Sequence, residues 1–345
     1  MTDSQWELLN RTIQGQRTAT LPVGFIIDCP WLPNWYGVSI LDYFSNDEIW
    51  LRANLKAISD FPDVMFLPGF WSEYGMCTEP SAFGVRCTFT RNEFPHAHTV
   101  LLSDDDLDSL PSPDPRTDGL LPLMLNRLRL AKPHIEEAGH KIRFAVARGP
   151  LNIASYLLGT SRFLTLLMMQ PDKAEKLVKK ITQFLKEWIA LQRETFPSID
   201  GILLLDDIIG FLGELEFRSF GLPYFKELYG TDVSVKFLHN DAPCRASAPF
   251  LPEMGVNLFN MGFEVTLNEL KTLTGNKVTL LGNIPPRDVL AGGTPDDVKR
   301  VTGELVDSLQ DKSRVIMSCG GGMPPGVKTE NIAAFIDAVK AHSAV

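Results

Sequence analysis

The sequence predicts a (β/α)8 barrel, and the pattern of apolar runs carries this prediction. About eight short apolar runs recur along the chain, and nearly all of them are separated by stretches with a helical pattern. Runs that are apolar on both faces imply a parallel sheet covered by helices. An open doubly wound sheet is the alternative, but no Gly-x-Gly-x-x-Gly follows the first strand. We therefore expect a single barrel domain over residues 1–345 with an N-terminal helical extension.

The N-terminal half alternates expected strands with expected helices. In chain order the elements are a helix at 4–15, a strand at 21–28, a helix from a Ser45–Glu48 capping box to Ile58, a strand at 64–69, a hairpin or edge insertion at 85–90 and 97–102, a helix at 120–139, a strand at 142–150 and a helix at 152–158. The loop at 70–84 is too long and too aromatic for a plain connection, which is typical of functional loops. The Asp- and Pro-rich stretch at 103–118 is interpreted as a solvated surface connection.

The C-terminal half repeats the same plan more clearly. Pro171 opens the clearest helix of the chain, whose apolar residues recur at a spacing of three and four. The elements after it are strands at 201–207, 235–241, 256–262, 278–283 and 314–319, and helices at 217–229, 245–253, 267–273, Thr294–Leu309 and Thr329–His342.

Charge and cysteine content exclude several classes of protein. The net charge is −9, from 33 basic and 42 acidic residues, which argues against a nucleic-acid-binding surface. Five scattered cysteines do not suggest a disulfide framework and fit a reduced cytosolic setting. No basic region followed by an apolar core opens the chain, and no run approaches the ~18 apolar residues of a membrane helix. We expect a soluble, cytoplasmic protein that does not bind membranes.

Polar residues gather where the expected strands end, and in a barrel these ends meet at one mouth. The strand-end residues are Asp28, Arg148, Asp206, Asp207, His239, Asn240, Asp241, Asn260, Asn283, Ser318 and Cys319. The loop residues expected above them are Trp31, Trp35, Tyr36, Trp71, Glu73 and Glu79. A histidine, a cysteine and a carboxylate are suitable zinc ligands, although no local metal motif such as His-Glu-x-x-His is present.

Each of these residues also has a plain structural interpretation. His239 would then be a hydrogen-bonded histidine at a strand end, and Cys319 a small buried thiol. Of Asp206 and Asp207, we expect one to point into the mouth and the other to cap a helix. The aromatic residues at 31–36 and 70–83 would be loop packing if they do not form the wall of a pocket for a flat apolar ligand.

The C-terminal half resembles the uroporphyrinogen decarboxylase superfamily, whose fold is a (β/α)8 barrel. The segments that carry the resemblance are Arg148-Gly-Pro150, Asp206-Asp207, His239-Asn-Asp241, Leu281-Gly-Asn-Ile-Pro-Pro286, Gly293-Thr-Pro295 and Ser318-Cys-Gly-Gly-Gly322 through Glu330-Asn331. Decarboxylases of this family carry an arginine-rich Met-Arg-Gln-Ala-Gly-Arg stretch after the first strand. Here that place reads Ile27-Asp-Cys-Pro-Trp-Leu-Pro, without arginine, so decarboxylation of a highly anionic tetrapyrrole is not expected.

The other branch of the superfamily consists of zinc methyltransferases that act with corrinoid proteins. Their metal ligands are a His-x-Cys and a later Cys, which His239 and Cys319 match, whereas Asp241 replaces the middle Cys and Cys244 is displaced by three residues. The resemblance implies zinc on His239, Cys319 and Asp241, with Glu73 or Glu79 as alternatives for the third ligand. An oxygen-richer zinc is a stronger Lewis acid, which favours an ether over a thiol as substrate.

The resulting hypothesis is O-demethylation of a methoxylated, aromatic substrate by a corrinoid-dependent methyltransferase. Asp207, Glu79 and Asn240 are the expected catalytic residues, and the expected substrate-binding residues are Trp31, Tyr36, Trp71, Arg148, Asn260 and Asn283. Because the chain has no Asp-x-His-x-x-Gly, the cobalamin is expected on a partner corrinoid protein. The alternatives are methyl transfer from a corrinoid to a thiol or folate, a metal-free lyase or decarboxylase, and a binding protein without chemistry. A homodimer is left open.

Overall fold

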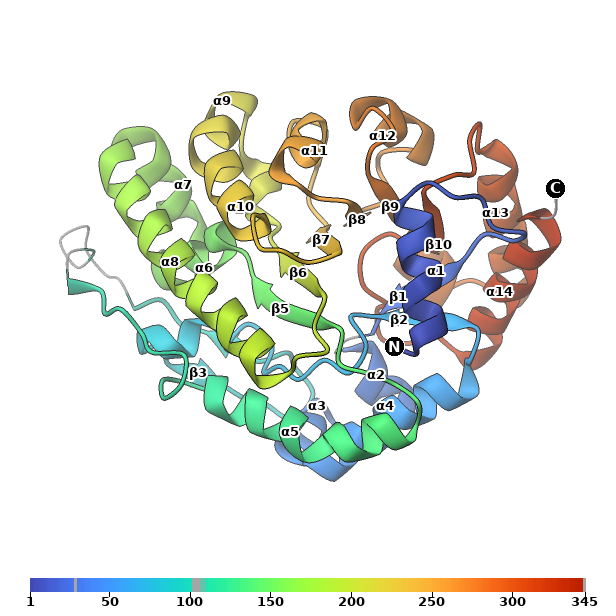
Figure 1. The fold of residues 1–345 in the computed structure, drawn as a ribbon, viewed down its shortest axis with the longest axis horizontal. Coiled ribbons are helices and arrows are strands. Elements are labelled where there is room, and N and C mark those ends of the chain that lie inside the picture. The colour runs from blue at the N-terminus through green and yellow to red at the C-terminus, as the bar shows by residue number, and fades with distance from the viewer. Residues whose placement is uncertain (28–29, 101–106, 108, 344–345) are drawn as a thin grey trace.

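Eight parallel strands form the main sheet, in the order β2-β1-β10-β9-β8-β7-β6-β5. The strands are β1 (Val23–Ile26), β2 (Val64–Leu67), β5 (Phe144–Arg148), β6 (Gly201–Leu205), β7 (Val235–Asn240), β8 (Leu258–Met261), β9 (Thr279–Ile284) and β10 (Val315–Cys319). The computed structural model describes residues 1–27, 30–100, 107 and 109–343. It confirms the predicted α/β barrel, with the strands in the middle of Figure 1 and the helices around them.

Helices separate the strands along the chain and cover the outer face of the sheet (Figure 1). The α-helices are α1 (Asp3–Ile13), α2 (Trp31–Tyr36), α3 (Ile40–Ser45), α4 (Asp47–Asp60), α5 (Leu121–Glu137), α6 (Pro150–Leu158), α7 (Thr160–Met169), α8 (Pro171–Thr195), α9 (Glu214–Glu216), α10 (Leu222–Tyr229), α11 (Leu251–Met254), α12 (Leu267–Leu273), α13 (Pro295–Ser308) and α14 (Thr329–Ser343). Short 3-10 or π-helical turns are η1 (Pro80–Phe83), η3 (Ile208–Phe211), η4 (Phe217–Gly221), η5 (Ala248–Phe250) and η6 (Pro286–Ala291).

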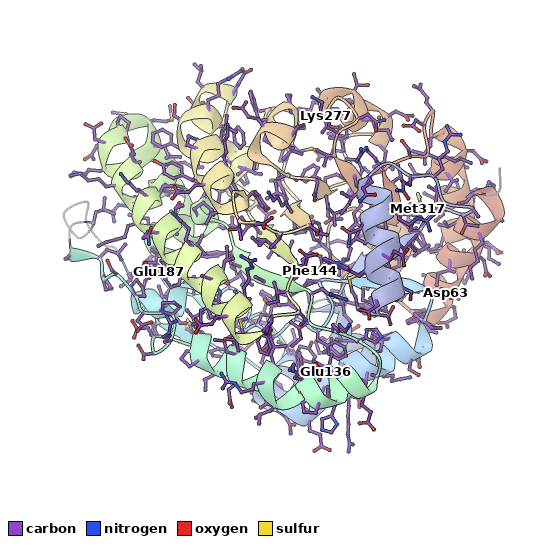
Figure 2. The ribbon with its side chains drawn as sticks, in the orientation of Figure 1. Asp63, Glu136, Phe144, Glu187, Lys277 and Met317 are labelled. Carbon is purple, nitrogen blue, oxygen red and sulfur yellow. The ribbon has the colours of Figure 1, made fainter. Side chains whose placement is uncertain are left out.

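Two apolar cores occupy the two faces of the sheet, because successive side chains of a strand point to opposite faces. Phe144 on β5 belongs to the smaller core inside the barrel, and Met317 on β10 belongs to the larger core beneath the helices. Both residues are labelled in Figure 2. Membership of one core or the other therefore tells which way each strand residue points.

Helix α1 closes the end of the barrel where the strands begin. Trp6 packs edge-on against Phe144, the first residue of β5, with ring centroids 5.4 Å apart. The Gln5 amide donates to the carbonyl of Val64, the first residue of β2. The Thr279 hydroxyl at the start of β9 donates to the Thr12 carbonyl. The opposite end, where the strands finish, is therefore the open side on which a barrel carries its active site.

Local sequence rules predicted many of the element boundaries, but one helix start and several short helices differ from the prediction. The Ser45–Glu48 capping box is wrong, because Ser45 already ends α3 and the Asn46 side chain instead accepts from the amides of Glu48 and Ile49. Helices α2, α3 and α7 were not predicted, and the residues of α2 were expected in a loop. The hairpin is confirmed, since β3 (Cys87–Thr88) pairs antiparallel with β4 (His96–Ala97). Part of the 103–118 connection lies outside the described residues. In the described part of the chain, none of the helices combines the length and apolar character needed to cross a bilayer.

Candidate active site

One row of residues crosses four neighbouring strands close to the mouth. The strand register aligns Arg148, Leu205, His239 and Asn260 on β5, β6, β7 and β8. Phe144, Phe237 and Leu258 lie in the interior core, so the residues at even spacing beyond them also face inward. The structure thus brings Arg148, His239 and Asn260 together on the inner surface at the carboxyl ends of the strands.

Asn260 fixes the orientation and the tautomer of His239. The Asn260 amide nitrogen donates to the carbonyl of Leu281 at 2.8 Å, so its oxygen is the atom that faces the imidazole. This oxygen lies 2.7 Å from Nδ1 of His239 and accepts a hydrogen bond from the Nδ1–H group. In the neutral imidazole Nε2 then carries a lone pair, and in the imidazolium it carries a second proton. Asn260 therefore orients His239 rather than contacting a substrate directly.

Two carboxylates lie close enough to His239 to affect its imidazole. The Asp241 Oδ2 atom lies 3.6 Å from Nε2, and an Asp207 carboxylate oxygen accepts from the Asp241 backbone amide at 2.7 Å. Burial by itself lowers the pKa of His239, but Asp241, Asp207 and the bond to Asn260 outweigh it and raise the pKa above its ordinary value. Burial raises the pKa of Asp207, which His239 partly offsets. The group is thus an imidazole biased toward its protonated form.

A glycine is required where Asp241 meets the loop after β10. Gly321 has a φ of +77°, and a Cβ placed on it would lie 2.2 Å from Oδ1 of Asp241. The Gly321 amide donates to the carbonyl of Met261 at 2.9 Å. Gly321 therefore lets the backbone approach Asp241 closely, which gives this glycine a structural function.

Arg148 is held by two glutamates of the loop at 70–84. Its guanidinium donates to Glu73 at 2.8 Å and to Glu79 at 3.2 Å, and all three side chains are buried. Burial works against the charged guanidinium, but Glu79 and Glu73 raise the pKa of Arg148 overall. Burial raises the pKa of Glu73 despite the neighbouring Arg148. Arg148 and Glu79 therefore form an ion-pair cluster that ties the loop to β5.

Asp206 and Asp207 divide their roles as expected. The Asp206 carboxylate accepts from the backbone amides of Leu151, Asn152 and Ile208, so it caps the start of α6 and the turn after β6. A Cβ on Gly149 would lie 2.3 Å from this carboxylate, which explains the glycine there. Asp206 is structural, and Asp207 is the residue directed toward His239.

The structure does not place Asn240 and Cys319 with His239. Leu238 and Met317, two residues earlier on their strands, belong to the core beneath the helices, and Cys319 belongs to that core too. Strand alternation thus directs Asn240 and Cys319 away from the interior. The Cys319 thiol donates to the carbonyl of Gly321 at 3.5 Å, and Asn240 accepts from the Ala242 amide. The catalytic prediction for Asn240 and the ligand prediction for Cys319 do not fit these positions.

The aromatic residues at 31–36 also pack away from the mouth. Trp31 is fully buried in the outer core, stacks on Trp35 and donates to the carbonyl of Val327 at 3.2 Å. Tyr36, the last residue of α2, packs against the same core. These contacts correct the prediction that Trp31 and Tyr36 bind substrate. Their spacing in sequence could not distinguish loop packing from a pocket wall.

Trp71 and Asn283 lie nearer the inner surface. Trp71 belongs to the interior core and is 7% exposed, so its side chain packs on the inner side of the sheet. The Asn283 amide donates to the carbonyls of Gly262 and Val265, which ties the loop after β8 to β9. Asn283 therefore has the loop-bracing role that was one interpretation of its sequence position.

One residue of the site, Tyr156, was missed in the sequence, and another, Ser318, was given no role. Tyr156 on α6 lies close enough to Arg148 and Asp207 for both to affect it, and burial raises its pKa to about 12. Ser318 faces inward by alternation from Ile316, is fully buried, and has no hydrogen-bond partner among the described residues. Ser318 appears in the strand-end set but without a role, and the helix at 152–158 gave no reason to single out Tyr156.

The zinc prediction can be compared with the donor atoms present. His239 Nε2 and Asp241 Oδ2, 3.6 Å apart, are compatible with two ligands of one ion. Glu73 and Glu79 are already paired with Arg148. Within residues 1–27, 30–100, 107 and 109–343, no three His, Cys, Asp or Glu side chains are placed to hold a metal. Since catalytic zinc takes three protein ligands, the described residues do not fit the predicted set.

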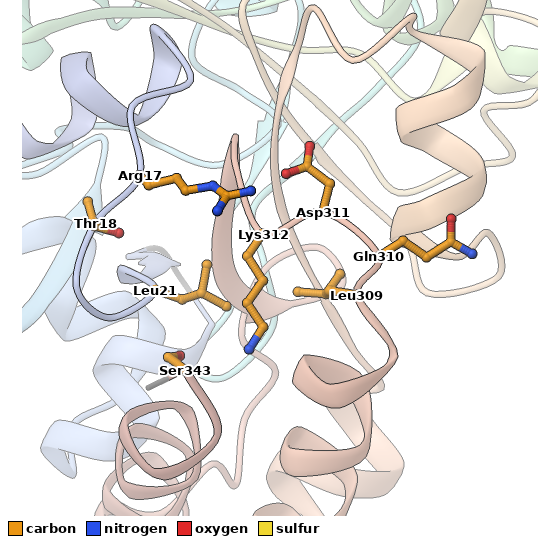
Figure 3. A pocket seen from close by; sticks show the side chains of 8 residues that line it. All are labelled: Arg17, Thr18, Leu21, Leu309, Gln310, Asp311, Lys312 and Ser343. Atoms are coloured by element: carbon orange, nitrogen blue, oxygen red, sulfur yellow. The ribbon is translucent and has the colours of Figure 1, made fainter. Parts of the chain in front are cut away.

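A cavity of about 270 Å³ lies at the opposite end of the barrel. It is lined by Arg17, Thr18, Leu21, Leu309, Gln310, Asp311, Lys312 and Ser343 (Figure 3). Leu21 precedes β1 and Lys312 precedes β10, so this cavity lies where the strands begin. In barrels that end serves stability, and we do not assign the chemistry to it.

Comparison with known proteins identifies the family. The profile described as "Uroporphyrinogen decarboxylase (URO-D)" matches residues 5–342. The chain belongs to the uroporphyrinogen decarboxylase family. Among the curated family members, uroporphyrinogen decarboxylase of Chloroherpeton thalassium is 25% identical over 278 residues, which cover 76% of each chain. That of Xylella fastidiosa is 22% identical over 310 residues, covering 84% of this chain and 81% of the relative.

A solved structure extends the likeness to the whole fold of this family member. A methyltransferase from Methanosarcina mazei superposes with a TM-score of 0.80 at 19% identity, covering 96% of this chain and 97% of the other. At this identity the match shows the shared fold. The family predicted from the strand-end motifs is thus confirmed.

Proposed function

We propose that the chain is the methyltransferase component of an O-demethylation system, which moves a methyl group from a methoxylated, aromatic substrate to the cobalt of a partner corrinoid protein. The observation that carries the proposal is His239, whose Nδ1 proton is held by Asn260 and whose Nε2 faces the mouth with a raised pKa. Such an imidazolium is a suitable general acid for a departing oxygen. The likeness to a methyltransferase structure supports the reaction class.

In the proposed step the bond between the methyl carbon and the ether oxygen breaks, and its electron pair stays on oxygen. The reduced corrinoid of the partner protein would supply the nucleophile that accepts the methyl group. His239 gives its Nε2 proton to the oxygen, so a hydroxyl compound leaves. Asp241 and Asp207 stabilise the imidazolium before transfer, and Asp207 also holds the Asp241 backbone in place. Asp207 thus acts by positioning, and Glu79 acts through its ion pair with Arg148.

Decarboxylation is the second candidate, because the curated relatives carry that name. Binding of a substrate with many carboxylates needs cationic groups that are free to pair with them. Arg148 already has two carboxylate partners, and Asp207 and Asp241 add negative charge beside His239. This arrangement favours a neutral substrate such as an aryl ether over a polyanionic tetrapyrrole.

Zinc remains a prediction from the sequence resemblance. His239 and Asp241 offer two donors, and the described residues do not supply the third. The step above therefore uses only the protonated imidazole.

A single-turnover assay tests the proposal. The protein is mixed with chemically reduced cobalamin and either a methoxyarene panel, uroporphyrinogen, or methylcobalamin with a thiol. Methylated cobalamin formed only from methoxyarenes supports O-demethylation. Release of CO2 from uroporphyrinogen would instead support a decarboxylase. Demethylation of methylcobalamin by the thiol would instead support methyl transfer from a corrinoid to a thiol.

A further inference from the structure

Two cysteine side chains meet beside the loop that carries the glutamate partners of Arg148. Cys77 is fully buried in this loop, and Cys87 is the first residue of β3 and partly exposed. The side chain of Cys77 is hydrogen-bonded to that of Cys87. The Cys87 thiol also lies 3.8 Å from the carbonyl of Val85. One thiol is thus reachable from solvent, and its partner lies directly behind it.

Cys77 sits at the turn that positions Glu79. Its backbone amide donates to the carbonyl of Tyr74 at 3.2 Å, and its carbonyl accepts from the Ser81 amide at 3.0 Å. Glu79 follows two residues later and pairs with Arg148 at 3.2 Å. Arg148 is also close enough to act electrostatically on the Cys77 thiol. A change at Cys77 therefore reaches the ion-pair cluster through a short, hydrogen-bonded turn.

The hydrogen bond divides the two thiols into a nucleophile and a resolving partner. The bond from Cys77 lowers the pKa of Cys87, while the same bond and then burial raise the pKa of Cys77. The thiolate is the form that reacts with peroxides, so the exposed Cys87 is the residue to be oxidised first.

We propose that Cys77 and Cys87 form a reversible disulfide on exposure to a hydroperoxide, and that this bond fastens the loop at 70–84 to the β3–β4 hairpin. The Cys87 thiolate attacks a peroxide oxygen, the O–O bond breaks, and Cys87 becomes a sulfenic acid with release of water. The Cys77 sulfur then attacks the Cys87 sulfur, the S–O bond breaks, and a second water leaves with the Cys77 proton. Overall, two thiols and one hydrogen peroxide give one disulfide and two waters.

Peptide mapping of the peroxide-treated wild-type protein tests the pairing directly. Trypsin cleaves after Lys56, Arg86 and Arg91, so the disulfide would join peptide 57–86 to peptide 87–91. We expect this cross-link, its reversal by dithiothreitol, and the loss of two of the five titratable thiols measured after denaturation. Cys87→Ser should lose no thiol pair, whereas the control Cys244→Ser, which changes another buried cysteine, should still lose two.

Hydrogen–deuterium exchange on the same samples tests the consequence for the loop. In wild type, amides at 74–88 should exchange more slowly after oxidation. In Cys87→Ser, the exchange rate of these amides should not change. In the peptide map of oxidised wild type, a Cys87 sulfonic acid without the cross-link, or a pairing of other cysteines, would overturn the proposal. This peptide map needs only wild-type protein. A cross-link without slower exchange would refute the fastening of the loop. None of these measurements depends on the methyl-transfer activity.

Discussion

The Nδ1 atom of His239 lies 2.7 Å from Oδ1 of Asn260, and the Asn260 amide is fixed in turn by the Leu281 carbonyl. This pair of bonds leaves only Nε2 for chemistry at the mouth. A histidine that takes part in proton transfer needs such a fixed tautomer, because a ring that is free to rotate presents the wrong nitrogen.

Replacing Asn260 should therefore impair turnover more than substrate binding. In Asn260→Leu we expect kcat for methyl transfer to fall about 10–100-fold with little change in KM, a loss typical of residues whose hydrogen bond orients an active histidine. Asn260→Asp, which keeps an acceptor for Nδ1, should retain more activity. Steady-state kinetics of both variants check this, and an equal rise in KM would indicate that Asn260 contacts the substrate.

The stability of the protein should carry a pH dependence that belongs to His239. Its pKa in the folded state is raised above the ordinary value of 6.5, so the protonated form favours folding. The stabilisation is fully present below 6.5 and is lost as the pH rises through the folded-state pKa. Urea unfolding of wild type and His239→Gln from acid to alkaline pH measures the difference. A difference that grows with rising pH would contradict the assignment.

Arg148 should contribute strongly to stability because its partners are buried. Arg148→Met leaves Glu73 and Glu79 buried without a counter-charge, which we expect to lower the free energy of unfolding by about 3–5 kcal/mol. The control Arg116→Met removes an exposed pair with Glu194 and should cost less than about 1 kcal/mol. Denaturant midpoints at pH 7 compare the two variants. Similar losses of unfolding free energy in both variants would show that the buried ion pairs stabilise the protein no more than the exposed pair does.

Metal content distinguishes the structural account from the sequence resemblance. His239 and Asp241 place two donors near each other, but the described residues do not supply a third. Purified protein should therefore hold less than about 0.2 zinc per chain. Elemental analysis of wild type and His239→Ala measures this. Stoichiometric zinc that disappears in His239→Ala would restore the zinc centre and assign His239 to it.

The sequence was informative about the fold because the barrel depends on repeated local patterns. Eight buried strands and their helices follow from apolar periodicity and from caps such as Thr294, which forms a capping box with Asp297. The boundary at Ser45 failed because two helices adjoin there, and the signature does not tell which of them a polar residue ends.

The site was predicted less completely, for a geometric reason. His239 and Asp207 were both expected at the mouth because parallel strand ends meet there, and in the structure they lie close enough to affect each other electrostatically. Whether a strand-end residue faces inward depends on alternation from the core, and one step turns it to the other face. Cys319 and Asn240 lie on that other face, while Ser318 and His239 face inward.

The dependence of methyl transfer on the leaving oxygen tests the central claim most directly. Wild type and His239→Gln are compared with reduced cobalamin and methoxyarenes that do or do not carry an electron-withdrawing nitro group. If His239 protonates the oxygen, His239→Gln should lower the rate of methyl transfer about 10²–10⁴-fold with the unactivated ether and far less with the nitro compound. An equal loss with both ethers, or no methyl transfer by wild type from any of them, would contradict the account.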